Sequence, residues 1–400
     1  MREGKLYQAI VQLNGHELNR LHRFILSPYF NRNEAIVNLF EWFKEYLKKT
    51  EKTEISKELL WKYCFGTTEP YDDGRFRKLQ SDLLRLVEEF YAQEVFEANP
   101  IHKAKYLLEA INIQRLDSLQ TTALKTAQNL IQAQELRPAS FYYYQYEIEQ
   151  STFDLYRYKA ERSEKSNIEE IAINLDRFYL AEKLRYYCTI LNHQYLTSSN
   201  YEMLFIDEII HHVESHGYHD VPPIKIYYQI LLVYKHPDNR EHYDKLRTLI
   251  RETIHLFPEP QVKEILDAAF NYCIQRSNTG NLEFVQELFS LYVESLENKM
   301  ILVNNQITPW SFKNIVTAGL RLSEFDWVEN FITTYSQLLD EKQRINAVTF
   351  NLAQLYFYKK DYLKVIQQLS QVEYEDMTYN LNSKTLLMAS YYELDEIEAL

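Results

Sequence analysis

Residues 350–372 read FNLAQLYFYKKDYLKVIQQLSQV, and the polar residues 359–361 divide them into two apolar runs. In the first run, Ala353 and Tyr356 are three residues apart. In the second run, apolar residues recur at intervals of three and four: Tyr362, Val365, Leu369 and Val372. This spacing places apolar side chains on one face of an α-helix. The stretch therefore predicts two short helices joined by a tight connection.

The spacing of the second run returns through the second half of the chain. Copies begin at Met203, Tyr243, Leu282, Phe325, Tyr362 and Ile397. Their starting positions are separated by 40, 39, 43, 37 and 35 residues. A two-helix unit of this length cannot bury its apolar face alone, so we expect successive units to stack.

Helical periodicity also dominates outside these copies, and sustained alternation of period two is missing. The fold class is therefore predicted to be all-α. Five helices are expected before Asn99–Pro100, at about 4–13, 16–26, 34–49, 56–64 and 73–97. The predicted domains are an N-terminal helical module, residues 1–98, and a helical repeat array, residues 99–400, which ends in mid-repeat.

Composition excludes several classes of protein. The 400 residues include 7 Gly, none spaced for a GxGxxG or GxxxxGK loop, so a nucleotide-binding α/β fold is not expected. The 3 cysteines lie far apart in sequence, which fits neither a disulfide framework nor a zinc site. The N-terminus lacks the apolar stretch of a secretory signal, and no window approaches a membrane helix. The sequence predicts a cytoplasmic protein without membrane contact.

The net charge of −13 is unevenly distributed. Residues 1–100 hold 15 basic and 16 acidic residues, and the other 300 hold 29 and 41. A long acidic array does not attract a phosphate backbone. We therefore do not expect the array to bind nucleic acid.

The chain resembles the tetratricopeptide repeats, and its best copy lies at 346–372. The matching residues are Leu352, Ala353, Tyr356, Asp361, Tyr362, Leu369 and Val372. Val365 stands where the family prefers Ala, and in the preceding copy Gly319 replaces the tyrosine. The resemblance implies a right-handed superhelix of antiparallel helix pairs whose concave groove binds a peptide or a helix. The groove positions that it implies are Trp310, Lys313, Thr317, Arg321, Phe350, Gln354, Phe357, Asn382 and Tyr392.

Residues 55–91 resemble the helix–loop–helix core of winged-helix domains in some bacterial activators that also carry tetratricopeptide-like halves. That resemblance implies a recognition helix at 74–92 with Arg75, Arg77 and Lys78 near its start. However, the connection at 65–73 is nine residues long, no alternating hairpin follows, and the module is not basic. We expect instead a structural helix that closes the bundle, with its apolar stripe buried: Leu79, Leu83, Leu86 and Phe90.

The sequence IIHHVESHGYHD at 209–220 contains the densest cluster of potential metal ligands: His212, His216 and His219. We take the buried stripe of this helix to be Ile206, Ile209, Ile210 and Val213. On that helix His212 points outward. An exposed helix end seldom supplies the supported second shell of a metal site. We therefore expect no metal and no cofactor. No Ser or Cys has a local catalytic signature, so the sequence predicts no catalytic residue and no enzyme.

Two functions remain open. The first is a non-enzymatic protein–protein interaction scaffold that binds a peptide or helix of another protein in the groove. The alternative is a transcriptional regulator, with the N-terminal module on DNA and the repeats as a sensor. Because the last copy begins near Glu396 and the sequence stops at Leu400, an exposed apolar patch is expected on 384–400. That patch either binds another chain, including a second copy of this protein, or indicates that the natural chain continues past Leu400.

Overall fold

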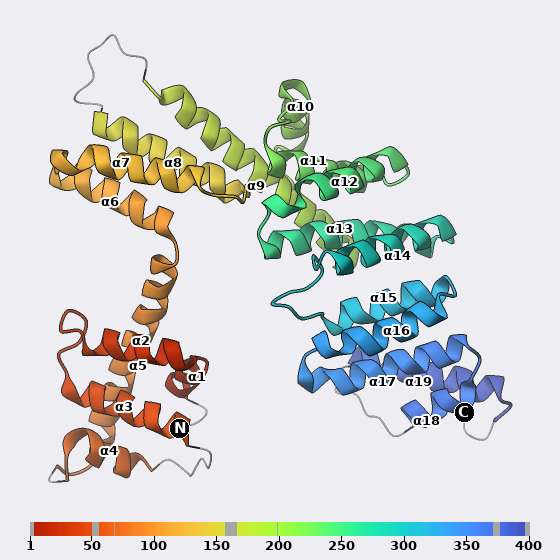
Figure 1. Ribbon diagram of the computed structural model, residues 1–400, viewed down its shortest axis with the longest axis horizontal. Helices are drawn as coiled ribbons and strands as arrows, with labels where there is room; N and C mark the ends of the chain where they lie inside the picture. The colour runs from red at the N-terminus through yellow and green to blue at the C-terminus, as the bar shows by residue number, and fades with distance from the viewer. Residues whose placement is uncertain are drawn as a thin grey trace. The chain divides into compact units, whose positions relative to one another are not determined.

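In a computed structural model of the chain, the fold is all-α (Figure 1). The structure describes residues 4–49, 56–67, 69–156, 166–197, 199–370 and 377–396. Within these ranges there are nineteen α-helices, two short 3-10 helices and no strand, apart from one isolated bridge between Val303 and Gln306. The predicted fold class is confirmed.

The chain divides into two compact units, residues 1–132 and 133–400. The boundary expected near residue 99 falls in the short connection between α5 (Asp73–Glu97) and α6 (Pro100–Gln114). The first unit continues past this connection and includes α6 and α7.

The first unit contains seven helices: α1 (Lys5–Val11), α2 (Gly15–Leu26), α3 (Glu34–Lys48), α4 (Lys57–Phe65), α5, α6 and α7 (Asp117–Gln132). The helix α5 contacts α1, α2 and α3, so it is the centre of this bundle. Its predicted stripe is buried: Leu79, Leu83, Leu86 and Phe90. The expectation of a structural helix is confirmed, because burial of these side chains supplies much of the core of the unit.

The second unit contains the remaining helices. They are α8 (Ala139–Tyr156), α9 (Ile168–Thr197), α10 (Ile206–His216), α11 (Pro222–Lys235), α12 (Arg240–Thr253), α13 (Glu259–Asn278), α14 (Leu282–Glu297), α15 (Pro309–Arg321), α16 (Phe325–Tyr335), α17 (Glu341–Tyr358), α18 (Tyr362–Leu369) and α19 (Met377–Glu393). The 3-10 helices η1 (Ile254–Leu256) and η2 (Ser336–Leu338) follow α12 and α16.

Consecutive helices of this unit pack in pairs, α11 with α12, α13 with α14, α15 with α16 and α17 with α18 (Figure 1). The first helices of neighbouring pairs also touch, as α11 does with α13 and α15 with α17. Three predicted copies begin at the first residue of a helix: Leu282, Phe325 and Tyr362. One apolar core runs without interruption from Ala139 to Leu355, so the pairs share it.

Gly319 fixes how closely α15 approaches its neighbours. A Cβ atom at this position would lie 2.6 Å from Val328 Cγ2 and 3.2 Å from Phe289 Cε2. The first distance is shorter than real carbon contacts, so only glycine allows α15 and α16 to pack this closely. The glycine that departs from the repeat pattern therefore has a packing role.

Replacing Gly319 with Ala should lower the free energy of unfolding by about 1–3 kcal/mol, because the added methyl group overpacks the α15–α16 interface. Urea denaturation followed by circular dichroism measures the change. Adding Val328→Ala should recover part of the loss, because it removes the methyl group in the way. Gly15→Ala, where no atom lies within 4 Å, is the control. An unfolding curve of Gly319→Ala that matches the unsubstituted protein would contradict this packing account.

Candidate partner-binding sites

A pocket of about 930 Å³ lies where α12, η1 and the start of α13 meet the end of α14 and the loop after it. Its apolar lining consists of Ile254, Phe257, Val262, Met300 and Leu302. Its polar lining consists of Arg251, His255, Glu259, Glu294, Asn298, Lys299, Asn304 and Asn305. A concave site with apolar walls and a few polar groups is typical of ligand binding.

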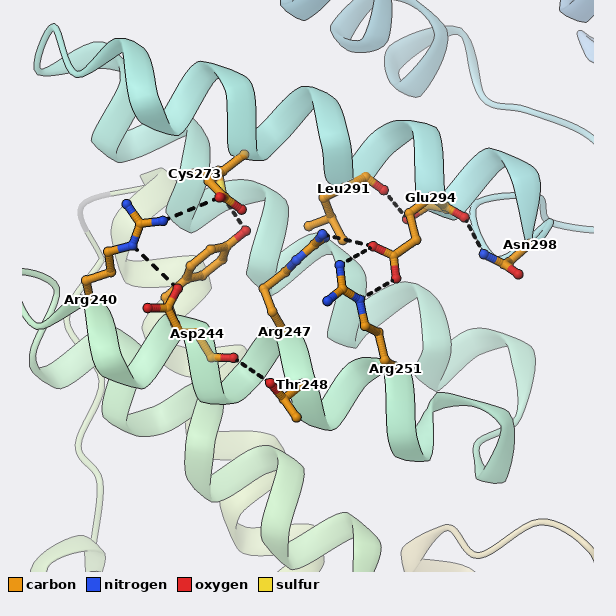
Figure 2. Close-up of polar contacts among 12 residues, drawn as sticks. Arg240, Asp244, Arg247, Thr248, Arg251, Cys273, Leu291, Glu294 and Asn298 are labelled. Carbon is orange, nitrogen blue, oxygen red and sulfur yellow. Dashed lines mark hydrogen bonds and ion pairs between the residues drawn. The ribbon is translucent and has the colours of Figure 1, made fainter.

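One wall of this pocket is held by an ion network between α12 and α14 (Figure 2). Arg251 donates two hydrogen bonds to the Glu294 carboxylate, from Nε to Oε1 at 2.9 Å and from Nη2 to Oε2 at 3.1 Å. Arg247 donates from Nη2 to the same Oε2 at 2.9 Å, and its side chain is only 8% exposed. The hydrogen bond from Arg251, together with the charge of Arg247, lowers the pKa of Glu294. Glu294 therefore neutralises a buried arginine and orients a more exposed one.

The same two helices are linked a second time, toward their N-terminal ends. Arg240 forms ion pairs with Glu283 and Glu287 of α14 and with Asp244 of its own helix. The α12–α14 pairs are separated by 43 or 47 residues in sequence, close to one repeat. Basic residues of one helix pair thus face acidic residues of the next pair.

The opposite wall of the pocket contains three residues in the left-handed backbone region. Lys299 has a φ of 56°, Asn304 of 51° and Asn305 of 60°. Lys299 follows α14 at the position where glycine is usual, and the amide of Met300 donates back to the carbonyl of Ser295 at 2.8 Å. The two asparagines form a tight turn that Val303 and Gln306 close with reciprocal backbone hydrogen bonds of 2.9 Å. Asparagine tolerates this region, whereas lysine is strained there.

The predicted groove residues of α15 differ in their accessibility. Trp310 is 46% exposed, and the ammonium of Lys313 lies 5.0 Å from the centre of its ring. Thr317 is half-buried and donates to the carbonyl oxygen of Lys313 at 2.9 Å. Arg321 is bound to Ser277, with Nη1 3.2 Å from its hydroxyl oxygen and Nη2 3.1 Å from its carbonyl oxygen. Trp310 is thus exposed on this face, while Arg321 links α15 to α13.

The predicted groove residues of α17 are less accessible. Phe350 is 1% exposed, because the Tyr379 ring of α19 covers it edge-on at 5.1 Å. It is a core residue and not part of an open groove surface. Gln354 and Phe357 are half-buried.

The two predicted groove residues of α19 also differ from each other. Asn382 is half-buried, and Tyr392 is 71% exposed. Leu381 and Met388 are exposed on the same helix as Tyr392. The structure thus shows exposed apolar side chains within and just before the predicted C-terminal patch, while residues 397–400 lie outside the described part.

The histidine-rich segment forms a compact polar contact. The rings of His212 and His216 stack at 4.1 Å, and His212 Nε2 lies 2.7 Å from the hydroxyl oxygen of Tyr218. His219 lines a second pocket, of about 520 Å³, between α10, α11 and α12. Over the described ranges, no group of three or more His, Cys, Asp or Glu side chains is placed to hold a metal ion.

The three cysteines are buried. Burial raises the pKa of Cys64 and of Cys273 to about 12. The Cys273 thiol donates to the hydroxyl oxygen of Tyr243 at 3.0 Å (Figure 2). These two thiols are therefore protonated at neutral pH.

The basic residues at the start of α5 are paired with acidic neighbours. Arg75 forms an ion pair with Glu69 at 3.0 Å and stacks over the rings of Trp61 and Phe65. Arg77 forms an ion pair with Asp73, and hydrogen bonds from Tyr71 and Arg77 lower the pKa of that carboxyl to about 2. Lys78 is exposed. Two of the three residues implied for DNA contact thus have their charges compensated within the helix start.

Sequence reasoning did not identify the pocket between α12 and α14. Its lining comes from three helix ends and two loops, which no local motif connects. The sequence does contain one indication of the ion network beside it. Arginine and glutamate recur about one predicted repeat length apart, as Arg247 and Glu294 do.

Comparisons with known proteins give no relatives: no protein-family model, no curated protein and no solved structure matches this chain. Among the helices that the structure describes, none is both long enough and apolar enough to cross a membrane.

Replacing Glu294 with Gln should lower the free energy of unfolding by about 2–4 kcal/mol at pH 7, because it leaves the buried charge of Arg247 without its counter-ion. The carboxylate has a lowered pKa in the folded chain, so its stabilisation is present above the ordinary glutamate pKa and is lost as the pH falls through the folded value. The difference between the two proteins should therefore shrink in acid. Urea denaturation at pH 7 and pH 3.5 measures it.

The matched control is Glu283→Gln, since Glu283 is also an α14 partner of an α12 arginine but is 59% exposed. Its loss should cost less than about 1 kcal/mol. Equal effects of the two substitutions would show that burial of Arg247 is not what makes Glu294 important.

Replacing Lys299 with Gly should raise the free energy of unfolding by about 0.5–1 kcal/mol, because glycine adopts the left-handed conformation without strain. Lys299→Ala removes the charge but keeps the strain, so it should give no such gain. Thermal unfolding of the two variants side by side makes the comparison. A gain from alanine as large as that from glycine would mean that charge, not backbone conformation, is unfavourable here.

Proposed function

We propose that this chain is a non-enzymatic scaffold that binds a peptide or helix of another protein along the first helices of its repeats. In this proposal the second unit is a right-handed superhelix of tetratricopeptide-like pairs. Its support is the packing: α15 contacts α17, and α17 contacts α19, so three first helices lie side by side. Such a row offers a long surface to an extended partner.

The observation that carries the proposal is the exposed Trp310. Its ring lies 6.2 Å from that of Tyr379, whose hydroxyl donates to the carbonyl of Pro309 at 2.9 Å. Tyr379 belongs to α19, so this contact connects α15 directly with α19. Lys313 approaches the same ring from its own helix. A half-exposed tryptophan held in place by its neighbours loses little freedom on binding, and tryptophan is enriched at interface hot spots.

Replacing Trp310 with Ala should weaken binding of the physiological partner by about 30-fold, the loss expected for a hot spot worth about 2 kcal/mol. Affinity capture by the unsubstituted chain, followed by mass spectrometry, identifies the partner. Titration of that partner against both proteins then gives the ratio.

Ile345→Ala is the matched control, because Ile345 is 76% exposed and also lies on a first helix, α17. It should bind the partner as the unsubstituted protein does. Thermal unfolding of each variant shows that the fold is intact. If the Trp310 and Ile345 variants bind equally well, the partner does not use this face.

A further inference from the structure

The pocket between α12 and α14 brings two cations together in an acidic part of the chain. Arg251 and Lys299 line it together with two carboxylates, Glu259 and Glu294, and the buried Arg247 lies behind this lining on Glu294. Residues 101–400, by contrast, hold 29 basic and 41 acidic residues. In an acidic surface, a cation that keeps a donor without an acceptor attracts an anionic group to one place.

Both carboxylates of the pocket already accept hydrogen bonds from other groups of the protein. Glu294 accepts hydrogen bonds from Arg247 and Arg251. Glu259 accepts a hydrogen bond from the backbone amide of Asn304 at 2.7 Å. The two cations of the lining form fewer hydrogen bonds within the protein. Arg251 uses Nε and Nη2 on Glu294, and within the described residues Nη1 of Arg251 and the ammonium of Lys299 have no protein acceptor. Donors without an acceptor at a pocket wall are available to a ligand.

These two cations stand on different elements, Arg251 in the last turn of α12 and Lys299 in the loop after α14. Apolar side chains belong to both walls: Ile254, Phe257 and Val262 on one, and Met300 and Leu302 on the other. A ligand that satisfies both kinds of group carries two negative charges with an aliphatic group between them. An acidic peptide with the pattern acidic–aliphatic–acidic has this arrangement, whereas an inorganic anion would leave the apolar walls unused.

Lys299 adopts the left-handed backbone region, as Arg115 and Lys360 do at the ends of other helices. A lysine in the left-handed region is costly, and such positions persist where the surrounding structure holds them, often at ligand sites. Glycine would serve the end of α14 better. Replacing Lys299 with glycine therefore removes the cation without disturbing the end of α14.

We propose that this pocket binds an acidic peptide segment of a partner protein, with its carboxylates on Arg251 and Lys299 and its aliphatic side chain against Phe257 and Leu302. The inference rests on the proposed scaffold function, and it adds a second contact site with a stated partner chemistry.

The test uses two short probes, acetyl-Asp-Leu-Glu-amide and its neutral counterpart acetyl-Asn-Leu-Gln-amide, titrated into the full chain by ligand-observed NMR. The acidic probe should bind at least tenfold more tightly than the neutral one. Lys299→Gly should weaken the acidic probe about tenfold, and since this variant should fold at least as well as the unsubstituted protein, the loss would not reflect unfolding. Arg251→Gln should weaken it by a similar factor.

The matched control is Lys263→Gln on α13, which removes an exposed lysine outside the pocket and should leave binding unchanged. Trp310→Ala should also leave it unchanged, so failure of the probe would not be confused with failure of the groove. Equal affinity for the acidic and neutral probes would overturn the proposal. So would full competition by inorganic phosphate at a similar concentration, because it would show a site for small anions only.

Discussion

Neither helix of a pair in the second unit can bury its apolar residues against its partner alone. The shared core from Ala139 to Leu355 shows how this is solved, because each pair supplies apolar surface to the pairs on both sides. Tyr272 of α13 illustrates it: its ring stacks on Tyr243 of α12 at 5.1 Å and meets Phe284 of α14 edge-on at 5.5 Å. Stability of any pair therefore depends on its neighbours, and a local change such as an added methyl group at Gly319 acts on an interface between helices.

Apolar contacts alone do not fix one position of a pair on the next, because they are not directional. Polar contacts between successive helix pairs do so. The Tyr272 hydroxyl donates to the carbonyl of Pro237 at 2.8 Å, Arg321 binds Ser277, and Arg247 binds Glu294. Each joins residues about one repeat apart, and guanidinium bonds have a narrow geometry. The burial of Arg247 makes its bond an obligatory one, since an uncompensated buried charge is costly.

The fold could be predicted from sequence because its signals are local. Leu282 and Tyr362 begin helices as predicted, and the residues before them, Asn281 and Asp361, accept hydrogen bonds from the first turns. The candidate sites were harder to predict. Phe350 is buried by Tyr379, which also bonds to Pro309, 70 residues away in sequence, and a family pattern does not contain such a contact. The pocket is assembled from helix ends and loops, where sequence periodicity carries no information.

Those helix ends are also where stacked helix pairs tolerate strain. In the middle of α14 a left-handed residue would break the hydrogen-bond ladder, whereas at its end Lys299 and Met300 still donate to carbonyls of the last turn. The left-handed turn at Asn304 and Asn305 is likewise closed by its own backbone bonds, so the cost at Lys299 stays local and does not spread into the shared core. The stacked helices then determine the distance between the walls, while the loops determine what the walls present. This division lets residues such as Lys299 serve binding at a local cost in stability, because the core that holds the pairs together does not depend on them.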